Sequence, residues 1–295
     1  MKKRFAALLL LALWGWASVA FAAPLHVVAS FTVLADMARQ IGGDHVQVRS
    51  LVGPNGDPHV YEPTPQDAEA LAHASLIVVN GLDLEGWMDR LIRASGTRGT
   101  VVVASAGIRT LRMDEHGRDV PDPHAWNSAA NAVVYAGNIA RALIAADPAD
   151  AADYRAAAAA YQARLRALDQ WARREIDRIP AARRVVITSH DAFGYMGAAY
   201  GIRFLAPVGF STESEASAAG VARLIDQIRR TRSHAIFLEN SNDPRLTEQI
   251  AAETGVQPDG TLYPEALSAA DGPAPTYTRM FRYNIETLLR GMQAH

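Results

Sequence analysis

Short apolar runs alternate with amphipathic segments along most of this chain. In its first part the apolar runs predict buried strands, and apolar residues at helical spacing between them predict helices. The predicted strands are Leu25–Ser30, Val46–Val52, Leu76–Asn80 and Thr100–Ala104, and the predicted helices are Thr32–Ile41, Pro65–Ala72 and Leu84–Ala94. Strands that alternate with helices at this spacing form βαβ units around a mainly parallel sheet.

The same order of elements starts again after Pro180. The predicted strands there are Arg184–Ser189, Ile202–Val208, Ala235–Glu239 and Val256–Leu262, and the predicted helices are Ala192–Tyr200, Ala216–Arg230, Pro244–Thr254 and Tyr277–Met292. The two parts share this order without a convincing internal sequence repeat. We therefore predict a second α/β lobe.

A polar loop, 107–123, and a predicted helix, Ser128–Ala145, lead from the first part to an unusual segment. This segment, Pro148–Ile179, is rich in Ala, Arg, Leu and Glu and has no internal Gly or Pro. A helix of about 30 residues spans roughly 45 Å, which is longer than one small domain. We predict an α/β fold with two lobes, each with a mainly parallel sheet flanked by helices, joined by this one long spanning helix. The lobes are 23–146 and 181–295, and the connecting helix is 147–180.

The composition is that of a globular protein long enough for two domains: 295 residues, of which 49% are hydrophobic and 20% charged. Residues 1–22 are excluded from the fold, because a basic start, an apolar run and Ala20-Phe21-Ala22 form a signal peptide, cut after Ala22. Its removal takes away three positive charges and moves the formal charge from −2 to −5. A mildly acidic mature protein offers no electrostatic footprint for nucleic acid.

The chain contains no cysteine, and no stretch after the signal peptide is long and apolar enough for us to expect a membrane span. Without cysteine there is neither a disulfide nor a lipidation site after the signal. We therefore expect a soluble periplasmic protein, in which any soft metal site must use histidine.

Three histidines stand where α/β proteins bind ligands. His59 lies in the proline-stiffened loop Gly53–Asp67, which follows a strand and ends in a helix start, with Thr64 as the N-cap. His124 repeats the local chemistry, Asp-Pro-His, in the other long loop of the first lobe, and His190 ends an apolar strand. Ligands in open α/β sheets bind at the carboxyl ends of strands. We predict that the three imidazoles converge on one metal ion.

Acidic residues near these histidines allow two interpretations. Asp57 and Asp122 either orient the imidazoles or only form the turns before proline. Glu265 is a candidate carboxylate ligand, because it follows the last predicted strand and sits beside a proline. Its competitors are Glu213, Glu215, Glu239 and Asp243. The remaining histidines are poorer candidates by position, and His116 is interpreted as a solvated residue of the polar loop.

The sequence resembles the zinc- and manganese-specific solute receptors of bacterial ABC importers, the ZnuA/TroA-like group, over essentially the whole mature chain. The resemblance rests on five segments: GDPHVYEPTP at 56–65, DPHAW at 122–126, HDAFGY at 190–195, ENSNDPRL at 239–246 and APTYTRMFRYN at 274–284. It implies two α/β lobes, a single spanning helix, a metal site in the cleft between the lobes, and small lobe movements.

The resemblance also implies a ligand set and a role. The metal ligands would be His59, His124, His190 and Glu265, although most relatives have Asp where Glu265 stands. Three imidazoles and one carboxylate suit tetrahedral Zn²⁺. Manganese receptors of this group generally carry a carboxylate in place of His190, so this histidine favours zinc, with Mn²⁺ or Fe²⁺ as the alternative. The implied role is a monomeric receptor, not an enzyme, that delivers metal to a membrane permease with a cytoplasmic ATPase; a periplasmic metal chaperone is a further candidate partner.

Two other classes of function compete with this interpretation. A secreted zinc hydrolase would hold zinc with three ligands and keep one position open for water, but the chain has neither a His-Glu-x-x-His run nor a Gly-x-Ser-x-Gly elbow. A metal-independent adhesin or structural protein would leave the three histidine loops unexplained.

Overall fold

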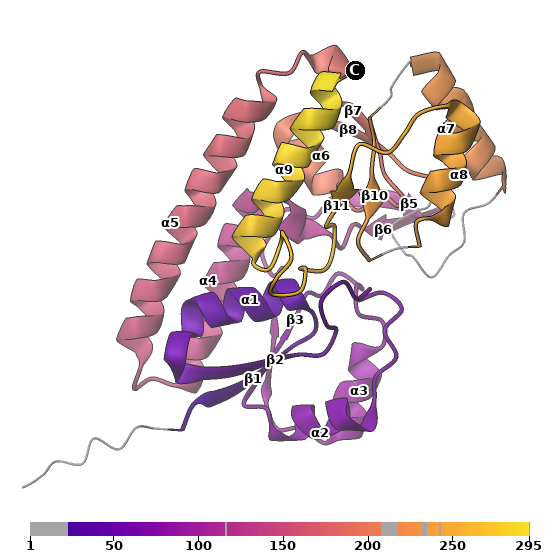
Figure 1. Ribbon diagram of the computed structural model, residues 1–295. Helices are drawn as coiled ribbons and strands as arrows, with labels where there is room; N and C mark the ends of the chain where they lie inside the picture. Colours follow the sequence, from indigo (N-terminus) through magenta and orange to yellow (C-terminus); the bar gives the residue numbers. More distant parts are fainter. Residues whose placement is uncertain (1–22, 116, 208–217, 232–234, 242, 295) are drawn as a thin grey trace, which may run out of the picture.

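The computed structural model describes residues 23–115, 117–207, 218–231, 235–241 and 243–294 (Figure 1). The predicted signal peptide lies outside these described residues, as do His116, Glu213 and Glu215. The described chain forms two α/β lobes, with a long helix running beside both of them. The predicted fold class is confirmed.

The first lobe is built on a four-stranded parallel sheet in the order β2-β1-β3-β4. Its strands are β1 (Leu25–Ala29), β2 (Val46–Ser50), β3 (Leu76–Val79) and β4 (Thr100–Val103), and its helices are α1 (Thr32–Gly42), α2 (Pro65–His73) and α3 (Met88–Ser95). A short 3₁₀ turn, η1 (Gly43–His45), links α1 to β2. Because right-handed crossovers run in opposite directions from β1, α1 covers one face of the sheet and α2 and α3 the other (Figure 1).

Two long helices follow. After the 3₁₀ turn η2 (Ala125–Asn127), α4 (Ala129–Ala146) packs along α5 (Ala151–Ile176), and α5 also contacts α1 of the first lobe and α9 of the second. The 26 residues of α5 span about 39 Å. The helix ends before Ile179, because the amides of Arg178 and Ile179 bond three residues back in a tighter turn ahead of Pro180.

In the described residues of the second lobe, the strands form two small parallel sheets, β8-β7-β9 and β10-β11. Its strands are β7 (Val185–Ile187), β8 (Arg203–Leu205), β9 (Ala235–Ile236), β10 (Leu238–Glu239) and β11 (Thr261–Leu262). Its helices are α6 (Gly194–Tyr200), α7 (Ala218–Thr231), α8 (Arg245–Thr254) and α9 (Tyr277–Ala294), with the 3₁₀ turn η3 (Ala181–Arg183) at the start.

The predicted strand Ala235–Glu239 is split between these two sheets. The amide of Phe237 donates to the Ile187 carbonyl of β7, whereas the amide of Leu238 donates to the Gly260 carbonyl next to β11. The partner therefore changes at one buried phenylalanine, whose ring packs on Gly291 of α9. Apolar composition alone does not reveal a change of partner within a continuous run.

The polar loop 107–123 also differs from the prediction. It contains an antiparallel hairpin made of β5 (Arg112–Glu115) and β6 (Arg118–Pro121). Gly117 takes a left-handed φ of 79° at its turn, and the Arg112 guanidinium donates to the Asp119 carboxylate at 2.6 Å. Where its exposure is described, this hairpin is exposed or half-buried, so its strands lack the apolar alternation on which the prediction depended.

The expectation that no stretch after the signal peptide could span a membrane is wrong for helix α4 by length and composition. Its apolar character has another cause in this fold: Ala132, Tyr135, Ile139 and Leu143 are buried against neighbouring elements. A helix that is apolar on most sides is typical of a buried core helix as well as of a membrane span.

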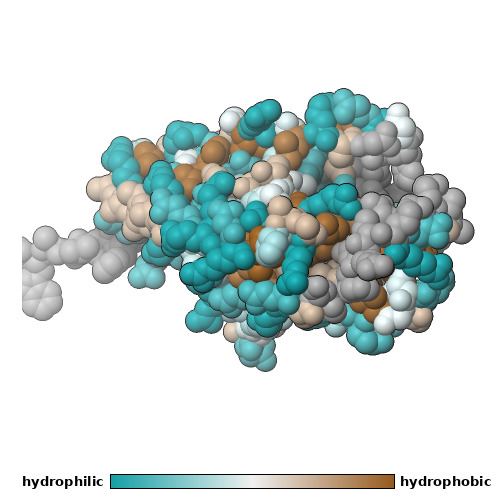
Figure 2. Space-filling model, turned by 90° about the horizontal axis from the view of Figure 1, so that it is seen from above, coloured by the Kyte–Doolittle hydropathy of each residue, from teal (hydrophilic) through white to brown (hydrophobic). Residues whose placement is uncertain are grey.

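The main apolar core is continuous through both lobes. One cluster includes Val27 of β1, Trp126 of η2, Leu165 of α5 and Phe281 of α9, and a smaller cluster lies under α7 and α8. The face of the molecule on which the chain ends is mostly hydrophilic, with small apolar patches between polar residues (Figure 2). A shared core between the lobes favours small relative movements over wide opening.

Candidate metal centre

The loop before α2 presents His59. The carboxylate of Asp57 accepts the backbone N–H of His59 at 2.8 Å, and the Trp87 indole N–H donates to the Pro58 carbonyl at 2.8 Å. At the far end of the loop, the backbone N–H of Thr64 donates to the Asp67 carboxylate at 2.8 Å, which confirms the predicted helix start. The loop is thus fixed on both sides of the imidazole, which is buried.

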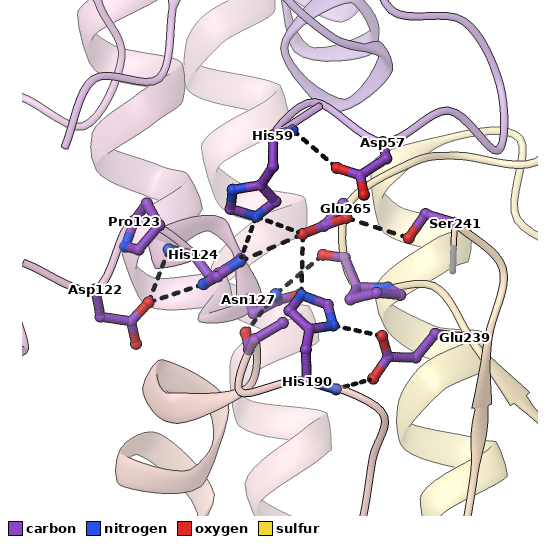
Figure 3. A network of polar contacts seen from close by, with 12 residues as sticks. Asp57, His59, Asp122, Pro123, His124, Asn127, His190, Glu239, Ser241 and Glu265 are labelled. Atoms are coloured by element: carbon purple, nitrogen blue, oxygen red, sulfur yellow. Dashed lines mark hydrogen bonds and ion pairs between the residues drawn. The ribbon is translucent and has the colours of Figure 1, made fainter. Parts of the chain in front are cut away.

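The loop after β6 presents His124 in a related way. Asp122 Oδ1 lies 2.9 Å from the backbone nitrogen of His124 and 3.0 Å from its Nδ1 (Figure 3). The Asn80 side chain donates to the Pro123 carbonyl at 2.9 Å, and the Tyr195 hydroxyl donates to the Asp122 carbonyl at 2.9 Å. Asp122 therefore forms the turn and also orients the ring, so that Nε2 faces inward.

The end of β7 presents His190. Its Nδ1 lies 2.5 Å from Glu239 Oε2, while Glu239 Oε1 accepts the backbone N–H groups of Ser189 and His190 at 2.9 and 3.3 Å. Glu239 ends β10 and is fully enclosed with the histidine. Glu239 was a competing candidate for the metal, but it contacts Nδ1 of His190, on the side of the ring away from Glu265. This contact orients the ring so that Nε2 points toward the centre.

Glu265 lies where the three imidazoles meet. Its Oε1 is 2.8 Å from His59 Nε2, 3.0 Å from His190 Nε2 and 3.4 Å from His124 Nε2 (Figure 3). The Nε2 atoms of His59 and His124 are 3.2 Å apart. The structure thus brings together all four residues expected from the sequence, in a buried group whose candidate ligand atoms lie within 4.8 Å of one another.

The charges of this group are coupled. Burial raises the pKa of Glu265, but the nearby imidazoles of His59 and His190 outweigh it and hold that pKa well below its usual range. Burial lowers the pKa of His190, but the carboxylates of Glu239 and Glu265 outweigh it and raise that pKa well above its usual range. The pKa of His124 is also raised, because hydrogen bonds to Asp122 and Glu265 exceed the effect of burial. In the metal-free protein these shifts favour charged imidazoles around an ionised Glu265.

Trp126 and Asn127, which follow His124 in the chain, connect the ligand-bearing loops by hydrogen bonds. Trp126 Nε1 donates to the Pro264 carbonyl at 2.8 Å. Asn127 Nδ2 donates to the carbonyls of Pro264 and Ala192, at 3.0 and 2.9 Å. The loop that carries His124 is thereby hydrogen-bonded to both ligand loops of the second lobe. One bond is at Pro264, just before Glu265, and the other is at Ala192, two residues after His190. Trp126 belongs to the DPHAW segment of the family resemblance, but Asn127 was not singled out from the sequence, because a buried amide that bridges loops has no sequence pattern of its own.

Asp243 is not part of the buried group at the centre. Asp243 is exposed and pairs with Arg245, and Glu213 and Glu215 fall outside the described residues. A second group, His45 with Asp150 and Asp153, lies at the surface. There the two ring nitrogens of His45 face different carboxylates, at 2.8 and 3.2 Å, which is typical of ion pairs rather than of a single metal position.

Three neutral imidazoles and one carboxylate form a donor set of nitrogen and oxygen atoms that binds divalent transition metals. His124 and His190 each have a carboxylate at Nδ1, which favours the tautomer whose Nε2 lone pair can bind a metal. The donor atoms come from both lobes and are almost fully enclosed. The arrangement is suited to holding a metal ion.

Known proteins that are similar to this chain are named for metal binding or metal uptake. The family model described as "Zinc-uptake complex component A periplasmic" matches residues 27–291. The iron-binding protein YfeA of Yersinia pestis is 36% identical over 268 residues, covering 90% of this chain and 85% of YfeA. The manganese ABC transporter substrate-binding lipoprotein PsaA of Streptococcus pneumoniae is 30% identical, covering 91% and 89% of the two chains.

A solved structure shows the same fold. The periplasmic zinc-binding protein TroA of Treponema pallidum superposes with a TM-score of 0.87 at 32% identity, covering 92% of this chain and 99% of TroA. The names of these relatives agree on metal binding but differ in the metal, since they name iron, manganese and zinc.

Proposed function

Because this chain belongs to the periplasmic zinc-uptake component A family, whose members are substrate-binding proteins of metal ABC transporters and not enzymes, we propose that its cargo is Zn²⁺. The ligands in this proposal are His59, His124, His190 and Glu265. The observation that carries it is the convergence of three imidazole Nε2 atoms on one carboxylate oxygen.

Ligand chemistry supports zinc over the alternatives. Zn²⁺ is commonly held by three imidazoles and one carboxylate oxygen in four-coordinate geometry. Mn²⁺ prefers more oxygen ligands, and the described site has a third nitrogen, from His190, at a distance of 3.0 Å from Glu265. Mn²⁺ or Fe²⁺ is the second candidate, favoured by the names of the relatives that bind manganese and iron.

The remaining parts of the proposal concern place and partners. We assign the lobes to residues 23–146 and 181–295, joined by 147–180. The mature chain works in the periplasm as a soluble monomer after removal of residues 1–22, a segment with a basic start and an A-x-A site. It passes its metal to a membrane permease driven by a cytoplasmic ATPase, and a periplasmic metal chaperone is a candidate donor.

Elemental analysis tests the choice of metal. The protein is purified from the periplasm without chelators or affinity tags, and the metal content per chain is measured for the parent, for His190→Glu and for His73→Ala. His73 is exposed at the end of α2 and serves as the control for loss of a histidine. We expect about one zinc per chain in the parent and control, and manganese or no metal in His190→Glu. Manganese or iron in the parent would contradict zinc while leaving the receptor role intact.

A further inference from the structure

The two oxygens of Glu265 have different neighbours. Oε1 faces the three imidazole Nε2 atoms at 2.8 to 3.4 Å. Oε2 points the other way and accepts the hydroxyl of Ser241 at 3.1 Å (Figure 3). Ser241 comes two residues after Glu239, on the loop that follows β10, and is half-buried. The two sides of this carboxylate therefore differ in chemistry.

The loop that carries Ser241 is fixed relative to Glu265. The backbone N–H of Asn240 donates to the Leu262 carbonyl at 3.0 Å. Its side chain donates to the carbonyl of Ala266, the residue after Glu265, at 3.3 Å, and to the Asn55 side chain at 2.9 Å. Asn55 lies in the loop that presents His59. These bonds of Asn240 hold the backbone of the loop beside Glu265, and so place Ser241 next to the carboxylate.

The number of carboxylate oxygens on the metal decides the coordination number. One oxygen with three imidazoles gives four ligands, the arrangement that zinc adopts most readily. Both oxygens would give five ligands and a larger share of oxygen, which suits manganese better. A hydroxyl that donates to Oε2 occupies a lone pair of that oxygen and opposes its rotation toward the centre.

We propose that Ser241 is a specificity-determining residue: its hydroxyl keeps Glu265 bound through Oε1 alone and so favours zinc over manganese. This inference rests on the proposed function, because it concerns the metal held by the same four ligands. Ser241 is a positioning residue, since it acts on the metal through Glu265.

The test compares Ser241→Ala with Ser241→Thr, which keeps a hydroxyl at the same position. The affinities of each protein for Zn²⁺ alone and for Mn²⁺ alone are measured by competition with a chromophoric chelator. The zinc-loaded forms are also compared by X-ray absorption. In Ser241→Ala we expect the zinc-to-manganese affinity ratio to fall about tenfold, which is the effect of losing one hydrogen bond to a charged group, and one further oxygen to appear around zinc. In Ser241→Thr we expect the parent ratio and the parent spectrum.

Two results would overturn the role of Ser241 without touching the receptor role: an unchanged ratio in Ser241→Ala, or an equal fall in the alanine and threonine variants. A parent protein that binds neither metal would instead overturn the proposed function. Circular dichroism and the melting temperature of each metal-free variant establish that a change in ratio does not come from unfolding.

Discussion

His190 Nδ1 lies 2.5 Å from Glu239 Oε2, and neither side chain is more than 1% exposed. The other oxygen of Glu239 accepts the backbone N–H groups of Ser189 and His190. One carboxylate at the end of β10 therefore fixes both the ring and the backbone of a residue at the end of β7. Because the two strand ends meet only in the folded chain, this relationship has no counterpart in sequence spacing.

Replacing Glu239 by Gln should weaken metal binding. A glutamine has one acceptor oxygen, so it can serve either the Nδ1–H of His190 or the backbone N–H groups, but not both as the carboxylate does. We expect the dissociation constant for Zn²⁺ to rise about 10- to 100-fold, which is typical for loss of a carboxylate behind a ligating histidine. Isothermal titration with a competing chelator measures this change.

Glu248→Gln is the matched control, because Glu248 is exposed on α8 and undergoes the same chemical change. Its zinc affinity should equal that of the parent. Equal affinity in all three proteins would show that Glu239 serves the backbone of Ser189 and His190 and contributes nothing through the imidazole.

Zinc affinity should fall as pH falls, because protons compete for the imidazoles. The carboxylates of Asp122, Glu239 and Glu265 raise the pKa of His124 and the pKa of His190 above 6.5 in the metal-free protein. Affinity should therefore keep rising with pH through the range above 6.5, in which ordinary histidines become mostly neutral. Equilibrium dialysis at pH 5.5, 6.5 and 7.5 measures the trend, and equal affinity at all three would contradict a histidine site.

The stability of the metal-free protein should follow a different pH dependence. Because their folded pKa is raised, His124 and His190 contribute stability that is fully present below their usual pKa of 6.5 and is lost as pH rises through the folded pKa. Glu265, whose pKa is lowered, contributes stability above its usual pKa of 4.5, which is lost as pH falls through the folded value. The increase in melting temperature on adding zinc should therefore be larger at pH 8 than at pH 6. A scan that gives equal increases would contradict this coupling.

Replacing Asn127 by Ala should loosen the junction between the ligand loops. The variant loses the donors to the carbonyls of Ala192 and Pro264, although Trp126 still donates to Pro264. We expect a loss of about 1–3 kcal/mol in the free energy of unfolding, the usual cost of leaving a buried acceptor unpaired. Urea denaturation of the metal-free protein measures it. Asn131→Ala is the control. It removes a hydrogen bond to the nearby Ala125 carbonyl, which does not connect different ligand loops, and should lower the free energy of unfolding by less.

The connecting helix offers a test of the shared core. Leu165 of α5 is fully buried in the cluster that runs through both lobes. Leu165→Ala should lower the free energy of unfolding by about 2–5 kcal/mol, whereas Arg166→Ala, on the exposed side of α5, should leave it nearly unchanged. Two separate unfolding transitions in the parent protein would contradict a core common to both lobes.

Local patterns were sufficient for the regular parts of the fold. Apolar residues identified β1 to β4, and β3, which is buried along its whole length, has the continuous apolar run typical of a parallel strand covered on both faces. The Thr64–Asp67 helix start was confirmed because a capping box acts over three residues. The hairpin of β5 and β6 and the split at Phe237 were missed, because each depends on which strand lies alongside and not on the composition of the segment.

By itself the sequence determined the two α/β lobes, the long helix and the identity of the four residues that meet at the centre, since these follow from periodicity, loop chemistry and family resemblance. Only the tertiary structure decided which groups stand behind those residues. Glu239 was a competitor for the metal until the ends of β7 and β10 placed it at Nδ1 of His190, and Ser241 had no assigned role until its hydroxyl was found at Oε2 of Glu265. The physical reason is that hydrogen bonds act over about 3 Å between atoms whose separation along the chain is unrestricted. A sequence records the order of such groups, whereas folding sets the distances between them.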